Sequence, residues 1–264
     1  MRQLMSGKEA VVYVVRCGEE IRCAKVYKEA EKRSFRQAVQ YTEGRKVKNS
    51  RRARAMEKGS RYGRREQETA WQNAEVDALY RLAAAGVRVP KPFNFHEGVL
   101  LMELVTDDNG HAAPRLNDLE PSAEQALEYH SLLIKQVVRM LCAGIVHGDL
   151  SEYNVLVGSD GPVIIDLPQA IDAAGNNSAE SMLLRDVGNL TAWFARFAPE
   201  LHSTDYGREI WSIYKSGKLH PEIALTGHFE ESNQPADVDG VIREIVEVKK
   251  EEAARQRFKQ ALGH

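Results

Sequence analysis

HGDLSEYN, at residues 147–154, and the aspartate of IIDLPQA, at residues 164–170, are the stretches of sequence that decide the fold. Phosphoryl transfer from ATP asks little covalent chemistry of a protein, but it requires charged and polar groups in fixed positions. At this spacing Asp149 can orient or deprotonate an attacking oxygen, while oxygens of Asn154 and Asp166 can hold magnesium on the phosphates. The pattern predicts an ATP-dependent phosphotransferase. A polar loop with a capping aspartate and an asparagine by chance is the alternative.

A β-hairpin is predicted between the two halves of this site. Apolar runs at residues 155–157 and 163–165 flank the turn-forming sequence Ser159-Asp160-Gly161. This pattern is typical of two antiparallel strands joined by a tight turn. Because such strands return the chain to where it started, we expect Asp166 to lie beside the loop of residues 147–154.

Lys25 and Glu75 are a candidate pair for positioning phosphates. Lys25 lies in CAKVY, a strand-like run in which an inward-pointing lysine is costly unless a carboxylate meets it. Glu75 shares the apolar face of a predicted helix with Ala78, Leu79 and other apolar residues. Enzymes of the protein kinase type use such a lysine–glutamate pair to hold the α- and β-phosphates. Taken singly, Lys25 also fits an exposed strand residue, and Glu75 a solvated helix residue.

The segment at residues 6–10, SGKEA, is a candidate phosphate-covering loop. It lacks the upstream glycine and following hydroxyl of a P-loop, and it is not the G-x-G-x-x-G loop of ordinary protein kinases. A single glycine between serine and lysine can still present backbone N–H groups to phosphates. A plain turn is the alternative.

Composition places the chain among soluble globular proteins without naming a partner. Its formal net charge is −2, no stretch approaches the roughly 18 apolar residues of a membrane span, and MRQLMSGKEA lacks the apolar core of a signal peptide. Cys17, Cys23 and Cys142 form neither a CxxC pair nor an even set, which argues against a disulfide framework or a cysteine zinc site. We expect a cytoplasmic protein with reduced thiols and no membrane partner.

One segment departs sharply from this balance. Residues 45–65 contain ten Lys/Arg and a single acid, Glu57, which gives a local charge of +9, so the rest of the chain carries −11. We interpret Arg45–Arg65 as a loop that can bind the phosphates of an RNA-containing particle with little sequence preference. A loop that is merely solvated is the alternative, and the segment has only Tyr62 for stacking on bases.

The remaining signals alternate between strands and helices. Strands are predicted at 11–15 and 21–26, a hairpin turn at 96–98, and helices at 66–85, from Ser122 to Gly144 and at 179–197. This order, together with the catalytic motif and the Lys25–Glu75 pair, predicts an α+β, two-lobed protein-kinase-like fold, with a small antiparallel-sheet N-lobe and a mainly helical C-lobe.

Three regions follow from this order. Residues 1–105 form the predicted N-lobe, with a basic insertion at about 28–65, residues 106–200 form the C-lobe, and 201–264 form a helical C-terminal extension.

Taken together, these stretches resemble the RIO family of atypical serine/threonine protein kinases. The resemblance rests on SGKEAVVY, CAKVYK, the helix carrying Glu75, VLLMELV as the lobe connector, HGDLSEYN and IIDLPQA, in that order over residues 5–197. Ordinary kinases have DFG where this chain has DLPQ, and an activation segment ending in A-P-E, which is not evident here. HGDLSEYN is similar to subfamilies without an N-terminal winged-helix domain, whereas DLPQ is similar to the one that has it. We expect a RIO protein of the type without that domain, and a bacterial member of the family fits this description.

The resemblance implies a role for each site residue. Asp149 would be the catalytic base, Asn154 a metal ligand, and Asp166 both a metal ligand and a candidate acceptor for an aspartyl-phosphate. Arg185-Asp186 would brace the catalytic loop from the following helix. The implied cofactors are ATP and Mg²⁺, with Mn²⁺ as an alternative. The implied ATP-binding residues are Ser6, Lys8, Lys25, Glu75, Met102, Glu103 and Val105, the backbone groups of Glu103 and Val105 meeting adenine.

Three functions from different classes fit the sequence. The first is a serine/threonine kinase, including self-phosphorylation at hydroxyls such as Ser50 or Ser60. The second is an ATPase-type switch on an RNA-containing, ribosomal particle. The third is a small-molecule kinase of the aminoglycoside or sugar type, since those enzymes also use H-G-D-x-x-x-x-N. SGKEA, the long basic insertion and DLPQ favour a RIO-type protein over the third. The protein substrate and the oligomeric state are not indicated.

Overall fold

The computed structural model describes residues 2–7, 10–28 and 61–230, with side chains from residue 72 onward in the last range. The chain divides into two units, residues 1–228 and 229–264. Three predictions lie wholly or partly outside the described residues. These are Lys8 over the phosphates, the basic segment Arg45–Arg65, and the part of the C-terminal extension beyond residue 230.

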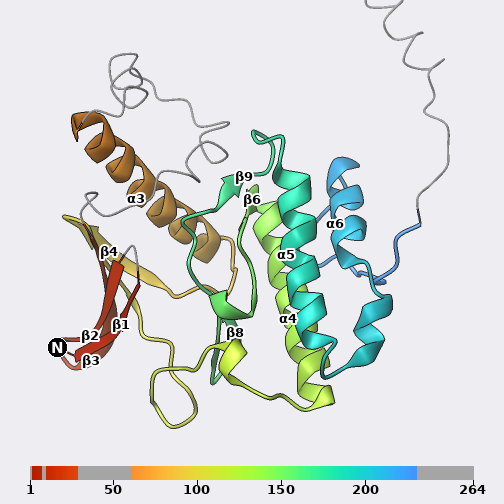
Figure 1. Cartoon of the computed structure of the whole chain (residues 1–264), viewed down its shortest axis with the longest axis horizontal. Helices are drawn as coiled ribbons and strands as arrows, with labels where there is room; N and C mark the ends of the chain where they lie inside the picture. Colours follow the sequence, from red (N-terminus) through yellow and green to blue (C-terminus); the bar gives the residue numbers. More distant parts are fainter. Residues whose placement is uncertain (1, 8–9, 29–60, 231–264) are drawn as a thin grey trace, which may run out of the picture. The chain divides into compact units, whose positions relative to one another are not determined.

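The N-terminal part is a five-stranded antiparallel sheet (Figure 1). Its order is β1-β2-β3-β5-β4, and its strands are β1 (Arg2–Ser6), β2 (Ala10–Cys17), β3 (Glu20–Tyr27), β4 (Pro92–His96) and β5 (Val99–Glu103). The turn between β4 and β5 contains Glu97 and Gly98, both with positive φ, as a two-residue hairpin turn requires. On β3, Lys25 is the register partner of Leu100 and shares its face with the buried Cys23.

Helix α3 (Arg61–Ala84) lies alongside this sheet and contacts β4. Its last three turns bury Val76, Leu79 and Leu82, and Gly86 follows with a φ of 74°, a conformation that favours glycine after a helix. The predicted helix is thus confirmed, with a start five residues earlier than expected, so residues 61–65, which we predicted as the end of the basic loop, are helical instead. Glu75 lies on the buried face of α3, which points its carboxylate toward the sheet.

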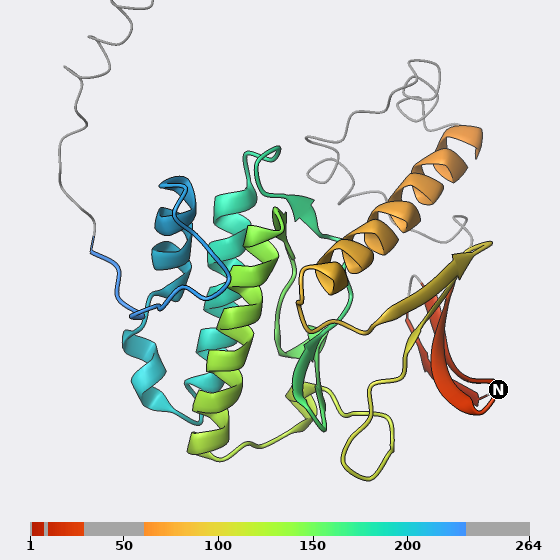
Figure 2. The ribbon, with the colours of Figure 1, turned by 180° about the vertical axis from the view of Figure 1, so that it is seen from behind.

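The rest of the unit is mainly helical, with α4, α5 and α6 side by side (Figures 1 and 2). The helices are α4 (Ala123–Cys142), α5 (Ala179–Phe194) and α6 (Tyr206–Lys215). Short 3-10 turns are η3 (Leu116–Asp118), η4 (Glu152–Asn154) and η5 (Pro199–Ser203). Leu133, Leu190, Phe194 and Ile210 are buried between the helices, so apolar packing fixes their positions.

Two short sheets support the loops that precede and follow the predicted site. The hairpin β7 (Val155–Gly158) and β8 (Gly161–Ile164) agrees with the sequence prediction, and β6 (Ile145–Val146) pairs with β9 (Ile171–Asp172). Asp166 and the start of α5 are separated only by residues 167–178, which contain β9 and no helix. This is a short connection where an ordinary kinase carries its activation segment.

The predicted α+β class is confirmed by an antiparallel sheet followed by a mainly helical part, with four α-helices among the described residues. Residues 201–228 contain η5 and α6, which contact α5, so they belong to the first unit. The sequence grouped them with the C-terminal extension. In the described stretches, no helix combines the length and apolar character that crossing a membrane requires.

We expect Ser122→Ala to lower the free energy of unfolding by about 1 kcal/mol. Ser122 Oγ accepts a hydrogen bond from the Gln125 N–H at 3.2 Å, and Gln125 Oε1 accepts one from the Ser122 N–H at 3.1 Å. The substitution leaves the Gln125 N–H at the start of α4 without its partner. Urea denaturation measures the effect. Ser131→Ala, an exposed site in the same helix, is the matched control and should be neutral or slightly stabilising; equal losses would contradict the capping role.

Candidate functional site

The loop that carries Asp149 begins with a buried, neutral histidine. His147 is 2% exposed, its Nε2 donates to the Ile165 carbonyl at 3.1 Å, and its Nδ1 accepts from the Asp149 N–H at 3.3 Å. Burial lowers the pKa of His147, although Ile165 and the carboxylates of Asp166 and Asp149 act in the opposite direction. A neutral imidazole is required for Nδ1 to accept a hydrogen bond. His147 therefore ties the loop to the chain segment that carries Asp166.

Residue 148 must be glycine, because the backbone conformation and the space around it admit no side chain. Its φ is 80°, and a Cβ added there would lie 2.6 Å from the carbonyl oxygen of Gln169. Any side chain would combine an unfavourable φ with a clash against backbone. The loop can thus pass close to the 166–169 segment only because residue 148 is glycine.

Helix α5 holds the loop through backbone contacts. Asp186 is 1% exposed, and its two carboxylate oxygens accept from the N–H groups of Gly148 at 2.7 Å and Leu150 at 3.0 Å. Arg185 Nη2 donates to the Gly148 carbonyl, which confirms the predicted contact of Arg185-Asp186 with the loop. Asn189 Nδ2 adds a bond to the Leu150 carbonyl at 3.2 Å. The sequence analysis missed Asn189, although it lies one helical turn after Arg185 on the same face.

Asp149 itself is presented to solvent. It is exposed between the buried residues Gly148 and Leu150, and its carboxylate makes no hydrogen bond or ion pair with any described residue. Asn154 Nδ2 donates to the Asp149 backbone carbonyl at 2.7 Å, which leaves the Asn154 amide oxygen facing away from that bond. The carboxylate of Asp149 is thus free to meet a substrate oxygen, and the amide oxygen of Asn154 is free to meet a cation.

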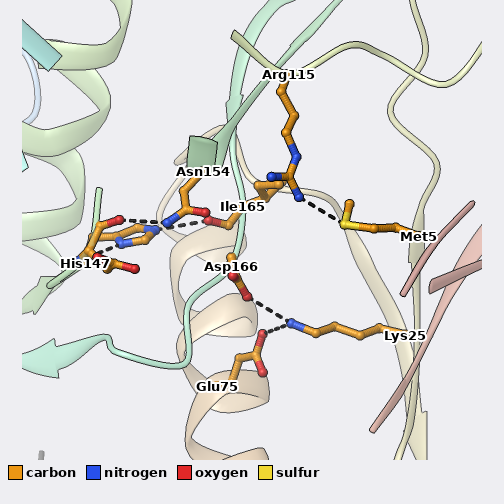
Figure 3. Close-up of polar contacts among 9 residues, drawn as sticks. Met5, Lys25, Glu75, Arg115, His147, Asn154, Ile165 and Asp166 are labelled. Carbon is orange, nitrogen blue, oxygen red and sulfur yellow. Dashed lines mark hydrogen bonds and ion pairs between the residues drawn. The ribbon is translucent and has the colours of Figure 1, made fainter. Parts of the chain in front are cut away.

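Lys25, Glu75 and Asp166 come together from three separate elements (Figure 3). Lys25 Nζ lies 2.5 Å from Glu75 Oε1 and 3.2 Å from Asp166 Oδ1. The side chains of Lys25 and Glu75 are 13% and 5% exposed, whereas that of Asp166 is 47% exposed. Burial lowers the pKa of Lys25, but the attraction of the two carboxylates outweighs it and the net pKa is raised. The lysine is therefore charged, and Asp166 remains open on its other side.

The hairpin positions Asp166 as the sequence analysis expected. The Ile165 N–H donates to the Asn154 carbonyl at 3.0 Å, and the Ile165 carbonyl accepts from His147, so the residue before Asp166 is fixed on both sides. Asp166 has a φ of 66°, a left-handed conformation that is uncommon outside glycine and asparagine and often marks functional positions.

The segment after β5 offers fewer free groups than the sequence suggested. Met102 lies on β5 opposite Cys23. The Glu103 N–H donates to the Lys91 carbonyl at 2.9 Å, so a contact of Glu103 with adenine would come through its carbonyl. Val105 is buried, and its carbonyl accepts from the Ala113 N–H at 2.9 Å. Its own N–H has no partner in the described ranges, which leaves that donor for a ligand.

The side chain of Glu103 belongs to a network that the sequence analysis did not anticipate. Its carboxylate accepts hydrogen bonds from Nη1 and Nη2 of Arg88, each at 2.8 Å, and from the Lys91 N–H at 3.0 Å. Burial raises the pKa of Glu103, but the bonds from Arg88 and Lys91 outweigh it and lower the pKa overall. Arg88 also donates its N–H to Gln136 of α4 and accepts from the Ile164 N–H. This arginine ties the end of β5 to both α4 and β8.

The candidate phosphate loop is contacted by a second lysine. Ser6 ends β1 and is exposed, and Lys28 Nζ donates to the Gly7 carbonyl at 2.6 Å and to Ser6 Oγ at 3.2 Å. Lys28 is the last residue of CAKVYK, three positions after Lys25, yet the sequence analysis assigned it no role. The ATP-binding roles of Ser6, Met102, Glu103 and Val105 stay predictions.

A divalent cation fits the oxygen atoms that the site presents. Asn154 and Asp166 offer an amide oxygen and a half-exposed carboxylate, both hard ligands of the kind that magnesium prefers. Within the described residues there is no group of three or more His, Cys, Asp or Glu side chains that could hold a metal alone. An ion at this position would therefore depend on phosphate and water oxygens as well.

Sequence similarity to known proteins identifies the family of this chain. The family model described as the RIO domain matches residues 11–206. The chain is 40% identical over 129 residues to RIO-type serine/threonine-protein kinase Rio1 of Haloferax volcanii, covering 48% of this chain and 42% of that protein. It is 34% identical over 193 residues to the Rio1 of Methanocaldococcus jannaschii, covering 72% and 61%. The chain thus spans less than two thirds of the length of these relatives, and the resemblance stated from the sequence is confirmed.

Among solved structures, the kinase domain of PF14_0431 aligns with a TM-score of 0.49 and 12% identity, covering 75% of this chain and 63% of that one.

We expect Lys25→Met to destabilise the protein by about 3–5 kcal/mol, because it leaves the carboxylate of Glu75 buried without a cation. The double variant Lys25→Met, Glu75→Leu removes both charges and should recover most of that loss. Urea denaturation of the wild type, both single variants and the double variant forms a closed cycle. Additive losses would contradict the pairing of these side chains.

The stability difference between wild type and Asp186→Asn should depend on pH. Burial raises the pKa of Asp186 from 3.8 to about 7, although the two amide bonds and Arg185 oppose this. Because the folded pKa lies above the ordinary value, the contribution of Asp186 to stability is complete below about pH 4 and is lost as pH rises through about 7.

The free energy of unfolding of the wild type, relative to Asp186→Asn, should thus fall between pH 5 and pH 7 by up to about 1.4 kcal/mol per unit. Denaturation at four pH values tests this, and the titrations of His130 and His147 cancel because both proteins contain them. A difference that is constant with pH would show that Asp186 is ionised throughout.

Proposed function

The chain belongs to the RIO kinase family, and from that premise we propose that it transfers the γ-phosphoryl group of ATP to a serine or threonine hydroxyl of a protein, itself included. The observation that carries the proposal is the meeting of three charged groups from separate elements. Lys25 of β3 is paired with Glu75 of α3 and with Asp166 after β8, beside the loop that presents Asp149. This is the set of charges that phosphoryl transfer from ATP requires.

Each residue then has a defined part in the transfer. Lys25 contacts the α- and β-phosphates, and Glu75 keeps its ammonium group in position. The exposed carboxylate of Asp149 accepts the proton of the substrate hydroxyl while the hydroxyl oxygen bonds to the γ-phosphorus. The bond between the γ-phosphorus and the bridging oxygen breaks, and ADP leaves with that electron pair. Asn154 and Asp166 would hold the metal ion, which would offset the negative charge of the phosphates.

The nucleotide lies, in this proposal, between two lobes formed by residues 1–105 and 106–200. Adenine meets the backbone of Glu103 and Val105 behind Met102. Support comes from the Val105 N–H, which is unbonded in the described part of the chain. The loop that begins at Ser6 and continues through Lys8 covers the phosphates, and the grip of Lys28 on the Gly7 carbonyl supports a fixed position for its first residues.

We propose magnesium as the resident metal, with manganese as an alternative, since both suit a site of oxygen ligands. We also propose a cytoplasmic location. Cys17, Cys23 and Cys142 are free thiols, and burial raises the pKa of Cys23 to about 11, which keeps that thiol protonated. Free thiols are the usual state in a reducing compartment.

An ATPase-type switch on an RNA-containing particle is the second candidate. The charge of Arg45–Arg65, ten Lys/Arg against Glu57, favours it, because phosphate backbones attract such segments. In that case Asp166 would receive the γ-phosphoryl group as an aspartyl-phosphate, which water then cleaves. The small-molecule kinase gains no support from the family match.

The function is tested by incubating the protein with magnesium and γ-labelled ATP, alongside Asp149→Ala, Asp166→Asn and the control Asp118→Asn, an exposed carboxylate on η3. We expect acid-stable label on serine or threonine that falls by about 10²–10⁴-fold in Asp149→Ala, because the proton acceptor is gone. Asp118→Asn should behave as the wild type.

Label that hydroxylamine removes, accompanied by steady phosphate release and abolished in Asp166→Asn, would favour the ATPase switch instead. Nucleotide binding is measured separately by fluorescence with a labelled ATP analogue. A wild type that neither binds nor turns over ATP would exclude both functions.

A further inference from the structure

A groove of about 560 Å³ lies away from the Lys25 cluster, on the helical part of the protein. Its walls are the loop between β5 and α4, the N-terminal half of α4 and the turn between β7 and β8. Arg115 of that loop forms an isolated β-bridge with Leu156 of β7, so the loop and the β7–β8 hairpin are neighbours. Neither the proposed catalytic residues nor the candidate adenine contacts line this groove.

The rim of the groove is strongly acidic. Five carboxylates line it from all three walls, namely Asp107, Asp108, Glu120, Glu128 and Asp160. None forms an ion pair with a lysine or arginine within the described ranges; His111 Nδ1 lies 3.9 Å from Asp107, and Arg88 is close enough to Asp160 for their charges to interact. Five carboxylates with so few cations beside them create a negative potential that attracts a basic ligand and repels phosphates. The charge of the rim thus argues for a polypeptide and against a nucleic acid.

The floor of the groove is apolar. Leu119, Tyr129 and Leu132 of the lining are half-buried and Val157 is buried, whereas the carboxylates of Asp108, Glu120, Glu128 and Asp160 belong to exposed residues, so we take these apolar residues as the floor. Burying an aliphatic side chain against these residues would remove apolar surface from water on both partners. An anchor seated in a pocket and ringed by contacts that exclude water is where interfaces concentrate their binding energy.

The walls are held together before any ligand arrives. The Ser159 N–H donates to the Thr106 carbonyl at 2.9 Å, and the Val157 N–H donates to the Pro114 carbonyl at 2.9 Å. At Gly158 the backbone is so close to the neighbouring loop that an added Cβ would lie 2.9 Å from Val105 Cγ1. Since the groove is already formed, a ligand would not have to order it on binding.

From this combination we propose that the groove is a docking site for an extended, Lys/Arg-rich segment of a partner protein that carries one aliphatic anchor. The basic side chains pair with the carboxylates of the rim, and the anchor lies on Leu119 and Leu132. The site is distinct from the nucleotide site, and binding there needs no turnover.

The proposal is tested by fluorescence anisotropy with the full chain and a labelled twelve-residue peptide of alternating Lys and Ser with one central Leu. Asp108→Lys and Glu128→Lys should each weaken binding about tenfold or more, because each places a cation beside the peptide's own. Glu124→Lys is the matched control, since it makes the same charge change one helical turn from Glu128 and outside the groove. It should change binding less than twofold.

Two further arms test the floor and the source of the ligand. Leu119→Gln should weaken the Leu peptide several-fold and leave a peptide with Ser in place of Leu unaffected. Arg51→Gln with Arg52→Gln should leave probe binding unchanged, whereas tighter binding would mean that the chain's own basic segment competes for the groove and would overturn the assignment to a partner.

Equal weakening by Glu124→Lys and Glu128→Lys, or equal affinity for a peptide with Glu in place of Lys, would also overturn the proposal. Thermal melting of each variant identifies losses of binding that are due to unfolding. If Glu128→Lys in α4 fails to fold, Asp108→Lys still tests the proposal, because Asp108 lies in an exposed loop. Because binding is measured without ATP, the outcome is independent of the proposed kinase activity.

Discussion

The buried ammonium group of Lys25 is the constraint on which the rest of the site depends. A lysine inside a sheet face is tolerated only where carboxylates offset the loss of water, and here one comes from α3 and one from the segment after β8. These partners are 50 and 141 residues away in sequence. The sheet, α3 and the β7–β8 hairpin must therefore assemble together before the charge is compensated. The same arrangement leaves Asp166 half-exposed, where it can meet a metal or a phosphate.

In the catalytic loop, the groups that hold the backbone are separate from the side chain available for chemistry. The groups that hold the loop, from Asp186, Arg185 and Asn189, contact its backbone rather than its side chains. Backbone atoms are the same whatever residue stands in the loop, so α5 can fix the path of residues 148–150 while Asp149 stays free for chemistry. The buried His147, a side chain of the loop itself, ties the loop on its other side to the Ile165 carbonyl. The loop is thus rigid where it is buried and available where it is exposed.

Charge is distributed unevenly over the chain, and the distribution suggests two kinds of partner. Arg45–Arg65 carries +9, whereas the groove beside the β7–β8 turn gathers five carboxylates that form no ion pair with Lys or Arg among the described residues. The first suits phosphate groups and the second suits a basic polypeptide. The nucleotide site differs from both, because its lysine, Lys25, is buried and paired with Glu75 and Asp166, whereas the Asp149 carboxylate is exposed. An assembly in which the protein contacts a basic protein and a polyanion at once would use both.

The sequence by itself determined the features that rest on local rules. The spacing of Asp149 and Asn154, the turn at Ser159-Asp160 and the start of a helix at Ser122 each depend on residues within a few positions, where hydrogen bonding and periodicity act directly. The Lys25–Glu75 pair was predictable as well, because a charged side chain on an apolar face is costly to bury unless an opposite charge meets it.

Only the tertiary structure decided the contacts between segments that no local rule connects. Arg88 meets Glu103 and Gln136 from two other elements, and Lys28 grips the loop at Gly7, yet each looks like an ordinary surface cation in the sequence. The acidic groove was even less predictable, since its carboxylates come from three separate parts of the chain, each of which looks like an ordinary polar stretch in the sequence. The physical reason is that side-chain contacts across the fold depend on how elements pack, and packing depends on the whole buried surface rather than on any one stretch of chain.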